Sequence, residues 1–210
     1  MKKILIVDDH EVLREGVKRI FNNQDSETIF GEAGTPQQAR ELVRVQTWDV
    51  VVLDLSLGDR SGLEVLKDLR QIRPKLPVIV LSMHSEEQYA RRAFQAGAAG
   101  YVTKGSPRAE LVKAINRAMD GGVYVSPDLA ELLVTDLGRD SDRPAHQVLS
   151  DREFEVMRLI ASGKTVSQIA QVLLISDKTV STYRGRILGK MGVRTNADII
   201  RYCLQNKLVD

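Results

Sequence analysis

Short aliphatic runs alternate with helical periodicity over the first 121 residues. Ile4–Val7 is a continuous aliphatic run of strand length, and Leu13, Val17, Ile20 and Phe21 then recur along one face of a helix. The alternation repeats, with strands expected near 28–32, 50–53, 78–81 and 100–102 and helices through 39–43, 65–72, 89–96 and 111–119. Aliphatic strands separated by amphipathic helices form parallel sheets covered on both faces. We therefore expect an α/β, doubly wound, parallel five-stranded sheet.

The last 63 residues carry closely spaced helix signals and no strand-like run. Ser150–Glu153 and Thr165–Gln168 are capping boxes that begin two helices. Ser176 caps a third helix, and Thr195 or Asn196 opens a fourth. Because only three residues join the second and third helices, this region matches a helix-turn-helix. The pattern predicts a small all-α domain of four helices.

A segment of different character separates these two patterns. Pro127–Leu137 predicts one short helix with its proline in the first turn, and the charged stretch 138–147 lacks apolar periodicity and is typical of a linker. The predicted organisation is an α/β domain at 1–121, a linker with a short helix at 122–147 and a helix-turn-helix domain at 148–210.

Composition narrows the class of protein further. The chain has 210 residues, of which 43% are apolar, which suits two small globular domains. The longest aliphatic runs are four residues, too short to cross a bilayer, and the apolar stretch after Met1–Lys3 stops at Asp8, too early for a signal peptide. Cys203 is the only cysteine, which excludes an internal disulfide. We expect a cytoplasmic protein without a membrane partner.

The formal net charge of +2 conceals an uneven distribution. Residues 148–210 carry ten Lys and Arg against six Asp and Glu, a surplus of four, whereas residues 122–147 are acidic and residues 1–121 are nearly balanced. A basic surplus in a short terminal domain favours a polyanionic partner, although an ordinary solvated surface explains it as well.

Five chemically active residues follow the predicted strands. Asp8 and Asp9 follow the first strand, Asp54 the third, Ser82 the fourth and Lys104 the fifth. In an open α/β sheet such residues converge at the carboxyl edge, where clustered carboxylates favour a hard cation such as Mg²⁺. A carboxylate can accept a phosphoryl group whose oxygens an ammonium and a hydroxyl hold. Phosphoryl transfer to Asp54 and a metal site that only stabilises the loops both remain open on spacing alone.

Four segments together resemble the receiver domain of two-component response regulators. The resemblance covers residues 3–121, and the segments that carry it are Asp8-Asp9, Val51–Asp54, Leu81–His84 and Ala96–Lys104. The resemblance implies a flavodoxin-like fold and phosphorylation of Asp54 by a sensor histidine kinase. It also implies functional roles for Asp8, Asp9, Asp54 and the Ser56 backbone carbonyl around Mg²⁺, for Lys104 at the phosphoryl group, and for Ser82 and Tyr101 as switch residues.

The third helix of the terminal domain has an apolar face and a basic face. The apolar face carries Val180, Ile187, Leu188 and Met191. A helix with cationic and short polar side chains fits the major groove of DNA, although an exposed helix can be basic by chance.

The terminal domain is similar to the LuxR-type DNA-binding domain. The segments that carry the similarity are Leu149–Glu153, Leu159–Gly163, Gln168–Ala170, Ile175–Val180 and Lys190–Val193. With the receiver it implies a NarL/FixJ-type regulator, nearest the GacA/UvrY-like members, with a helix-turn-helix at 166–185. The residues expected at DNA are Lys178, Thr179, Ser181, Thr182, Tyr183, Arg184, Gly185, Arg186 and Lys190.

The combined interpretation is a transcriptional regulator switched by phosphorylation of Asp54, and not an enzyme. Its expected partners are double-stranded promoter DNA, a sensor histidine kinase and a second copy of the chain, with a homodimer forming on phosphorylation or on DNA. An alternative is a receiver–helix-turn-helix factor regulated by a protein partner without phosphorylation. A flavodoxin-like enzyme is disfavoured because Asp8-Asp9-His10, and not a glycine-rich phosphate loop, follows the first strand.

Overall fold

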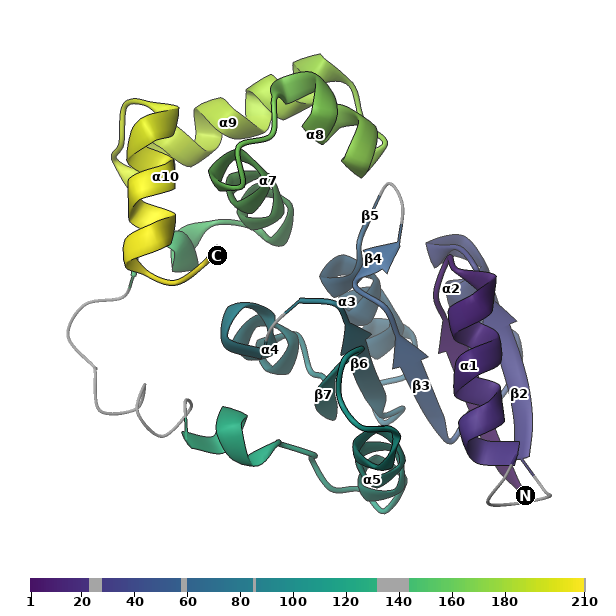
Figure 1. Ribbon diagram of the computed structural model, residues 1–210. Coiled ribbons are helices and arrows are strands. Elements are labelled where there is room, and N and C mark those ends of the chain that lie inside the picture. Colours follow the sequence, from purple (N-terminus) through teal and green to yellow (C-terminus); the bar gives the residue numbers. More distant parts are fainter. Residues whose placement is uncertain (23–27, 58–59, 85, 132–143, 210) are drawn as a thin grey trace. The chain divides into compact units, whose positions relative to one another are not determined.

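The N-terminal unit is built on a parallel sheet. The computed structural model describes residues 1–22, 28–57, 60–84, 86–131 and 144–209. Within them, five strands pair in the order β2-β1-β3-β6-β7, which confirms the doubly wound sheet (Figure 1). Their bounds are β1 Lys2–Val7, β2 Thr28–Ala33, β3 Val50–Leu53, β6 Val78–Ser82 and β7 Gly100–Thr103. The strand order reverses at β1 and β3, the point where such sheets carry their sites.

Helices cover both faces of this sheet (Figure 1). Alternate strand residues such as Ile4, Val52 and Val102 form one buried cluster with apolar residues of α1 and α5. The neighbouring strand residues Leu5 and Val51 are equally buried on the opposite face. The helices are α1 Glu11–Asn22, α2 Pro36–Val45, α3 Gly62–Ile72, α4 Glu86–Gln95 and α5 Arg108–Met119. Burial on both faces explains why these strands are continuous aliphatic runs.

A small hairpin that the sequence pattern did not predict follows β3. Its strands are β4 Ser56–Leu57 and β5 Arg60–Ser61, paired antiparallel. Two-residue strands are too short for any periodicity to show. Gly62 closes the hairpin against the chain next to Asp54, where a Cβ would lie 2.3 Å from Leu55 Cα. The hairpin and this close approach fix the backbone beside Asp54.

The chain leaves α5 along the edge of the sheet. Gly121 has φ +79°, and the backbone N–H of Tyr124 donates to the carbonyl of Ala99 at 2.8 Å. Residues 127–131 are helical, as predicted, while the rest of the predicted Pro127–Leu137 helix and residues 138–143 lie outside the described residues.

The C-terminal unit is helical. In the described part of the chain it contains the 3-10 helix η1 and four α-helices, in agreement with the predicted all-α domain. Their bounds are η1 Ala145–Val148, α7 Asp151–Ala161, α8 Val166–Leu173, α9 Asp177–Met191 and α10 Asn196–Gln205. Residues 145–147, expected to be irregular linker, instead begin η1, where the His146 ring contacts the Tyr202 hydroxyl at 2.9 Å.

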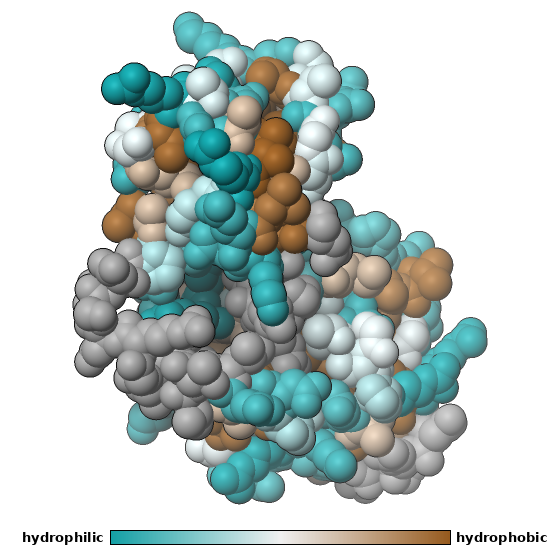
Figure 2. Space-filling model, turned by 60° about the vertical axis from the view of Figure 1, so that its left-hand side comes forward, coloured by the Kyte–Doolittle hydropathy of each residue, from teal (hydrophilic) through white to brown (hydrophobic). Residues whose placement is uncertain are grey.

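The helical unit has a closed core and a mostly polar surface. Phe154, Ile187 and Cys203 are fully or almost fully buried in the core. Burial raises the pKa of the Cys203 thiol to about 11, which fits a core residue rather than a reactive one. On the face shown in Figure 2, apolar side chains reach the surface in patches. The large apolar side chains exposed among the described residues of this unit are Val148, Val172, Leu174 and Leu204. None of the described helices combines the length and the apolar character needed to cross a bilayer.

Candidate functional site

Strand pairing brings the predicted acidic residues together at the carboxyl edge of the sheet. Val7 on β1 pairs with Leu53 on β3, so Asp8 and Asp54 emerge side by side. In the same way, β6 and β7 end together, and the backbone N–H of Lys104 donates to the carbonyl of Ser82 at 2.7 Å. The register therefore accounts for the convergence expected from the sequence.

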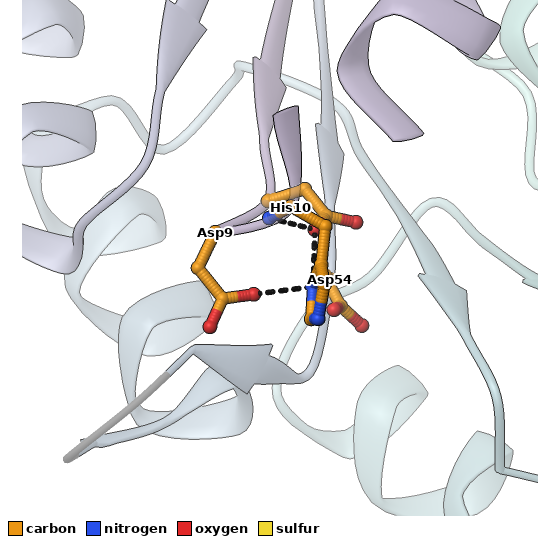
Figure 3. A group of neighbouring side chains, drawn as sticks. Asp9, His10 and Asp54 are labelled. Atoms are coloured by element: carbon orange, nitrogen blue, oxygen red, sulfur yellow. Dashed lines mark hydrogen bonds and ion pairs between the residues drawn. The ribbon is translucent and has the colours of Figure 1, made fainter. Parts of the chain in front are cut away.

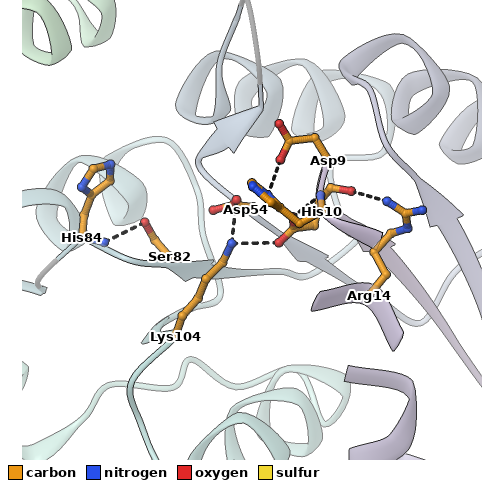
Figure 4. Close-up of polar contacts among 8 residues, drawn as sticks. Asp9, His10, Arg14, Asp54, Ser82, His84 and Lys104 are labelled. Atoms are coloured by element: carbon orange, nitrogen blue, oxygen red, sulfur yellow. Dashed lines mark hydrogen bonds and ion pairs between the residues drawn. The ribbon is translucent and has the colours of Figure 1, made fainter. Parts of the chain in front are cut away.

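Lys104 bridges two of these carboxylates. Its Nζ lies 2.8 Å from Asp8 Oδ2 and 2.7 Å from Asp54 Oδ2, and all three side chains are almost completely buried (Figure 4). Burial raises the pKa of the Asp54 carboxyl, and the hydrogen bond and charge of Lys104 offset this only in part. Burial lowers the pKa of the Lys104 ammonium, but its bonds to Asp54 and Asp8 outweigh that effect and leave it raised. One ammonium does not fully compensate the buried negative charge.

The acidic cluster consists of Asp8, Asp9, His10 and Asp54, whose potential metal-ligand atoms all lie within 4.8 Å of one another. Asp54 Oδ1 is buried and has no hydrogen-bond partner. An unpaired buried carboxylate oxygen is costly, and a cation bound there would satisfy it. Carboxylate oxygens are the ligands that hard divalent cations prefer. The residues therefore fit a divalent cation.

His10 also belongs to this cluster, although it was not among the site residues predicted from the sequence. Its Nδ1 is 2.7 Å from Asp9 Oδ1 and 3.2 Å from Asp8 Oδ1 (Figure 3). Its backbone N–H also donates to Asp8 Oδ1 at 2.8 Å. The ring is 63% exposed, so it borders the cluster on the solvent side.

The two predicted switch residues are joined through one backbone position. The backbone N–H of His84 donates to Ser82 Oγ at 3.2 Å, and the Tyr101 hydroxyl donates to the His84 carbonyl at 2.9 Å. Ser82 and Tyr101 are both fully buried, so the tyrosine ring points inward. The His84 ring in turn stacks on Tyr89 with centroids 4.4 Å apart. Ser56, the remaining predicted residue, lies on β4 two positions after Asp54.

In the helical unit, α8 and α9 form the predicted helix-turn-helix. The α8 helix ends at Leu173, and Leu174 follows in the left-handed conformation with φ 51°. The Ser176 hydroxyl then accepts from the backbone N–H of Thr179 at 3.1 Å and caps α9. The Arg152 guanidinium, almost fully buried, donates to the carbonyl of Leu173 at 2.8 Å and fixes the turn to α7.

Most of the residues predicted at DNA are open to solvent on α9. The exposed ones are Lys178, Ser181, Thr182, Gly185, Arg186 and Lys190, and the half-buried ones are Thr179, Tyr183 and Arg184. Two of the cations also have partners within the unit. Arg184 Nε donates to Asn196 Oδ1 at 2.6 Å, and Lys190 Nζ lies 2.6 Å from the buried Glu153 Oε2. The surface is therefore polar and basic, and two of its cations also hold α9 in place.

Sequence families match both units. Residues 4–116 match the response regulator receiver domain, and residues 147–203 match the bacterial regulatory proteins of the luxR family.

Known proteins are similar to this chain over its whole length. The chain is 33% identical to the response regulator GacA of Pseudomonas aeruginosa, over 100% of this chain and 99% of the relative. It is 31% identical to the response regulator UvrY of Escherichia coli K12, over 99% and 96%. The solved structure of RcsB from Salmonella enterica serovar Typhimurium bound to promoter rprA aligns over 96% of this chain and 97% of that chain, with a TM-score of 0.64 and 24% identity. At that identity the likeness concerns the fold.

Proposed function

Because this chain belongs to the two-component response regulators that join a receiver domain to a LuxR-type DNA-binding domain, we propose that phosphorylation of Asp54 controls its binding to promoter DNA. The observation that carries the proposal is the buried Asp54 carboxylate, which Lys104 holds through one oxygen while the other has no hydrogen-bond partner. The cytoplasm is the proposed location, because a promoter-binding role would be carried out there.

Asp54 is the proposed nucleophile, and a phosphohistidine of a sensor kinase is the proposed donor. An Asp54 oxygen attacks phosphorus, an O–P bond forms, and the P–N bond breaks. The imidazole leaves with the electron pair of that bond. Lys104 already lies 2.7 Å from Asp54, so its ammonium is available to the phosphoryl oxygens. Ser82 is the second proposed group at the phosphoryl.

Mg²⁺ is the proposed cation. Asp8, Asp9, Asp54 and the Ser56 backbone carbonyl are the proposed ligands, and the ion, when bound, neutralises charge on the phosphoryl oxygens. The unpaired Asp54 Oδ1 supports this assignment because a buried carboxylate oxygen that lacks a donor favours a cation. With Asp8 as a ligand of the ion, Lys104 would remain available to the phosphoryl oxygens through its position beside Asp54.

Tyr101 is the proposed output of the switch. Its hydroxyl donates a hydrogen bond to the His84 carbonyl, and the His84 backbone N–H donates one to the Ser82 hydroxyl. A movement of the Ser82 hydroxyl toward a phosphoryl group would change the His84 backbone and with it the Tyr101 bond. A new charge would thus bias a two-state element.

The exposed basic side of α9 is the proposed DNA surface. Ser181, Thr182 and Gly185 would lie nearest the bases, and Lys178, Thr179, Arg186 and Lys190 would lie near phosphates. Tyr183 and Arg184 are half-buried and would contact the DNA backbone from the edge of this surface. A homodimer on two half-sites about one helical turn apart suits such a domain.

The test compares wild type with Asp54→Asn after incubation with Mg²⁺ and a small acyl phosphate. We expect wild type to gain one phosphoryl group by mass spectrometry and Asp54→Asn to gain none. Asp120→Asn, an exposed carboxylate at the end of α5, is the matched control and should be labelled like wild type. Absence of a phospho-adduct on wild type would refute the proposal.

DNA binding is measured with a duplex selected by wild type from a random-sequence library. We expect phosphorylation to increase affinity for this duplex in wild type and not in Asp54→Asn. If wild type is phosphorylated but its DNA affinity does not depend on Asp54, the result favours the alternative hypothesis, regulation by a protein partner without phosphorylation.

A further inference from the structure

Arg14 on α1 reaches back to the loop that carries the acidic cluster. Its Nη1 donates to the backbone carbonyl of Asp8 at 2.8 Å (Figure 4). Its Nε donates to Glu32 Oε2 at 2.9 Å. The Arg14 side chain is only 16% exposed. The guanidinium therefore connects α1, the end of β1 and β2 at one point.

This contact completes the restraint of Asp8. Its backbone N–H donates to the carbonyl of Ala33 at 3.1 Å, and its carboxylate accepts from Lys104 and from the backbone N–H of His10. Among the contacts of the described residues, the Asp8 carbonyl is held by Arg14. Since Asp8 and Asp9 are adjacent, a rotation of the Asp8–Asp9 peptide would move both carboxylates.

The guanidinium is itself held in place. Glu32 accepts from Arg14 and from Lys18, whose Nζ lies 2.6 Å from Glu32 Oε1. These hydrogen bonds lower the pKa of the Glu32 carboxyl, so it stays charged. The planar guanidinium offers several N–H donors in a fixed fork, which a lysine ammonium does not reproduce.

We propose that Arg14 is a positioning residue of the cation site, which sets the Asp8–Asp9 backbone so that both carboxylates face the cation. This inference rests on the proposed function, because the cation serves phosphorylation of Asp54. Arg14 supports the ligand without being one. Groups that support metal ligands in this way typically change metal affinity by about 10- to 100-fold when removed.

Charge and position make opposite predictions for Arg14. A positive charge near a cation site repels the cation, so Arg14→Gln would tighten Mg²⁺ binding if only charge mattered. Loss of the restraint on Asp8 would weaken it. Arg14→Lys separates the two effects further, since it keeps the charge and removes the fork.

The experiment is isothermal titration of the full chain with Mg²⁺ alone. We expect both Arg14→Gln and Arg14→Lys to bind Mg²⁺ about tenfold more weakly than wild type. Arg19→Gln is the matched control: it makes the same change at an exposed arginine of the same helix, away from the acidic cluster, and we expect its affinity within about twofold of wild type. Unfolding in urea checks that each variant is folded.

Phosphorylation by a small acyl phosphate gives a second measurement. At Mg²⁺ concentrations well above the variant's own dissociation constant for Mg²⁺, Arg14→Lys should be phosphorylated at a rate close to that of wild type. At low Mg²⁺ its rate should be lower than the wild-type rate by about the ratio of the two Mg²⁺ affinities. Mg²⁺ binding of Arg14→Gln equal to or tighter than wild type, or of Arg14→Lys equal to wild type, would overturn the inference. If wild type binds Mg²⁺ but is never labelled, the proposed function fails while the Arg14 comparison still stands.

Discussion

Gly185 offers a test of how α9 meets DNA. It lies in the middle of a 15-residue helix, is exposed, and a Cβ built on it would have nothing within 4 Å. Glycine in a helix interior costs about 1 kcal/mol relative to alanine. We therefore expect Gly185→Ala to raise the free energy of unfolding of the helical unit by about 1 kcal/mol, because the methyl group meets no neighbour.

The same substitution should weaken DNA binding if the bare backbone at Gly185 lies against the duplex. Loss of one close contact at a base edge costs about 1–3 kcal/mol, which is about a 5- to 150-fold loss of affinity. The assay is fluorescence anisotropy with the library-selected duplex at fixed salt, since affinity for DNA depends steeply on salt. Urea unfolding followed by circular dichroism supplies the stability.

Gly189 is the matched control, one turn further along α9. It is also exposed and has nothing within 4 Å of a built Cβ. Gly189→Ala should show the same gain in stability with little change in DNA affinity. A Gly185→Ala variant that is more stable and binds DNA like wild type would refute the close-approach hypothesis. Equal weakening by both substitutions would assign the effect to the whole face rather than to Gly185.

Three further predictions concern local packing and charge. Gly62→Ala places a methyl group 2.3 Å from Leu55 Cα, so we expect a loss of about 1–3 kcal/mol in urea unfolding and slower labelling by an acyl phosphate. Burial raises the pKa of the Glu153 carboxyl, but its bonds to Lys190 and to the cap outweigh this and leave it below the ordinary 4.5. This ion pair therefore stabilises the unit above about pH 4.5, and its contribution is lost as the pH falls through the lowered pKa. Because Lys190 is 42% exposed and the Ser150 N–H still bonds Glu153, urea unfolding of Lys190→Met should show a loss of about 1 kcal/mol at pH 7 and progressively less in acid. Leu174→Gly should stabilise the helical unit by up to about 1 kcal/mol, since Leu174 has φ 51° and is 66% exposed; a lower urea midpoint would contradict this.

The acidic edge could be predicted because it depends only on where strands end. Asp8 and Asp54 directly follow aliphatic runs, and the parallel pairing of β1 with β3 places them side by side. The helix-turn-helix could be predicted for a similar reason, because capping at Thr165 and Ser176 is local. Both depend on order along the chain and on periodicity, which the sequence contains.

Contacts between side chains that are distant in the sequence could not be predicted in this way. They change the role expected of single residues. Lys190 lies on the basic side of α9 by its spacing, which predicts a phosphate contact. In the structure its ammonium lies 2.6 Å from Glu153, the N3 residue of the α7 capping box, 37 positions earlier. The side chain is still 42% exposed, so the packing of α7 against α9 gives one lysine two competing partners. If Lys190 bound a DNA phosphate, it would leave the buried Glu153 carboxylate without this partner. We therefore expect Lys190 to contribute less to DNA binding than its position on the basic side of α9 predicts.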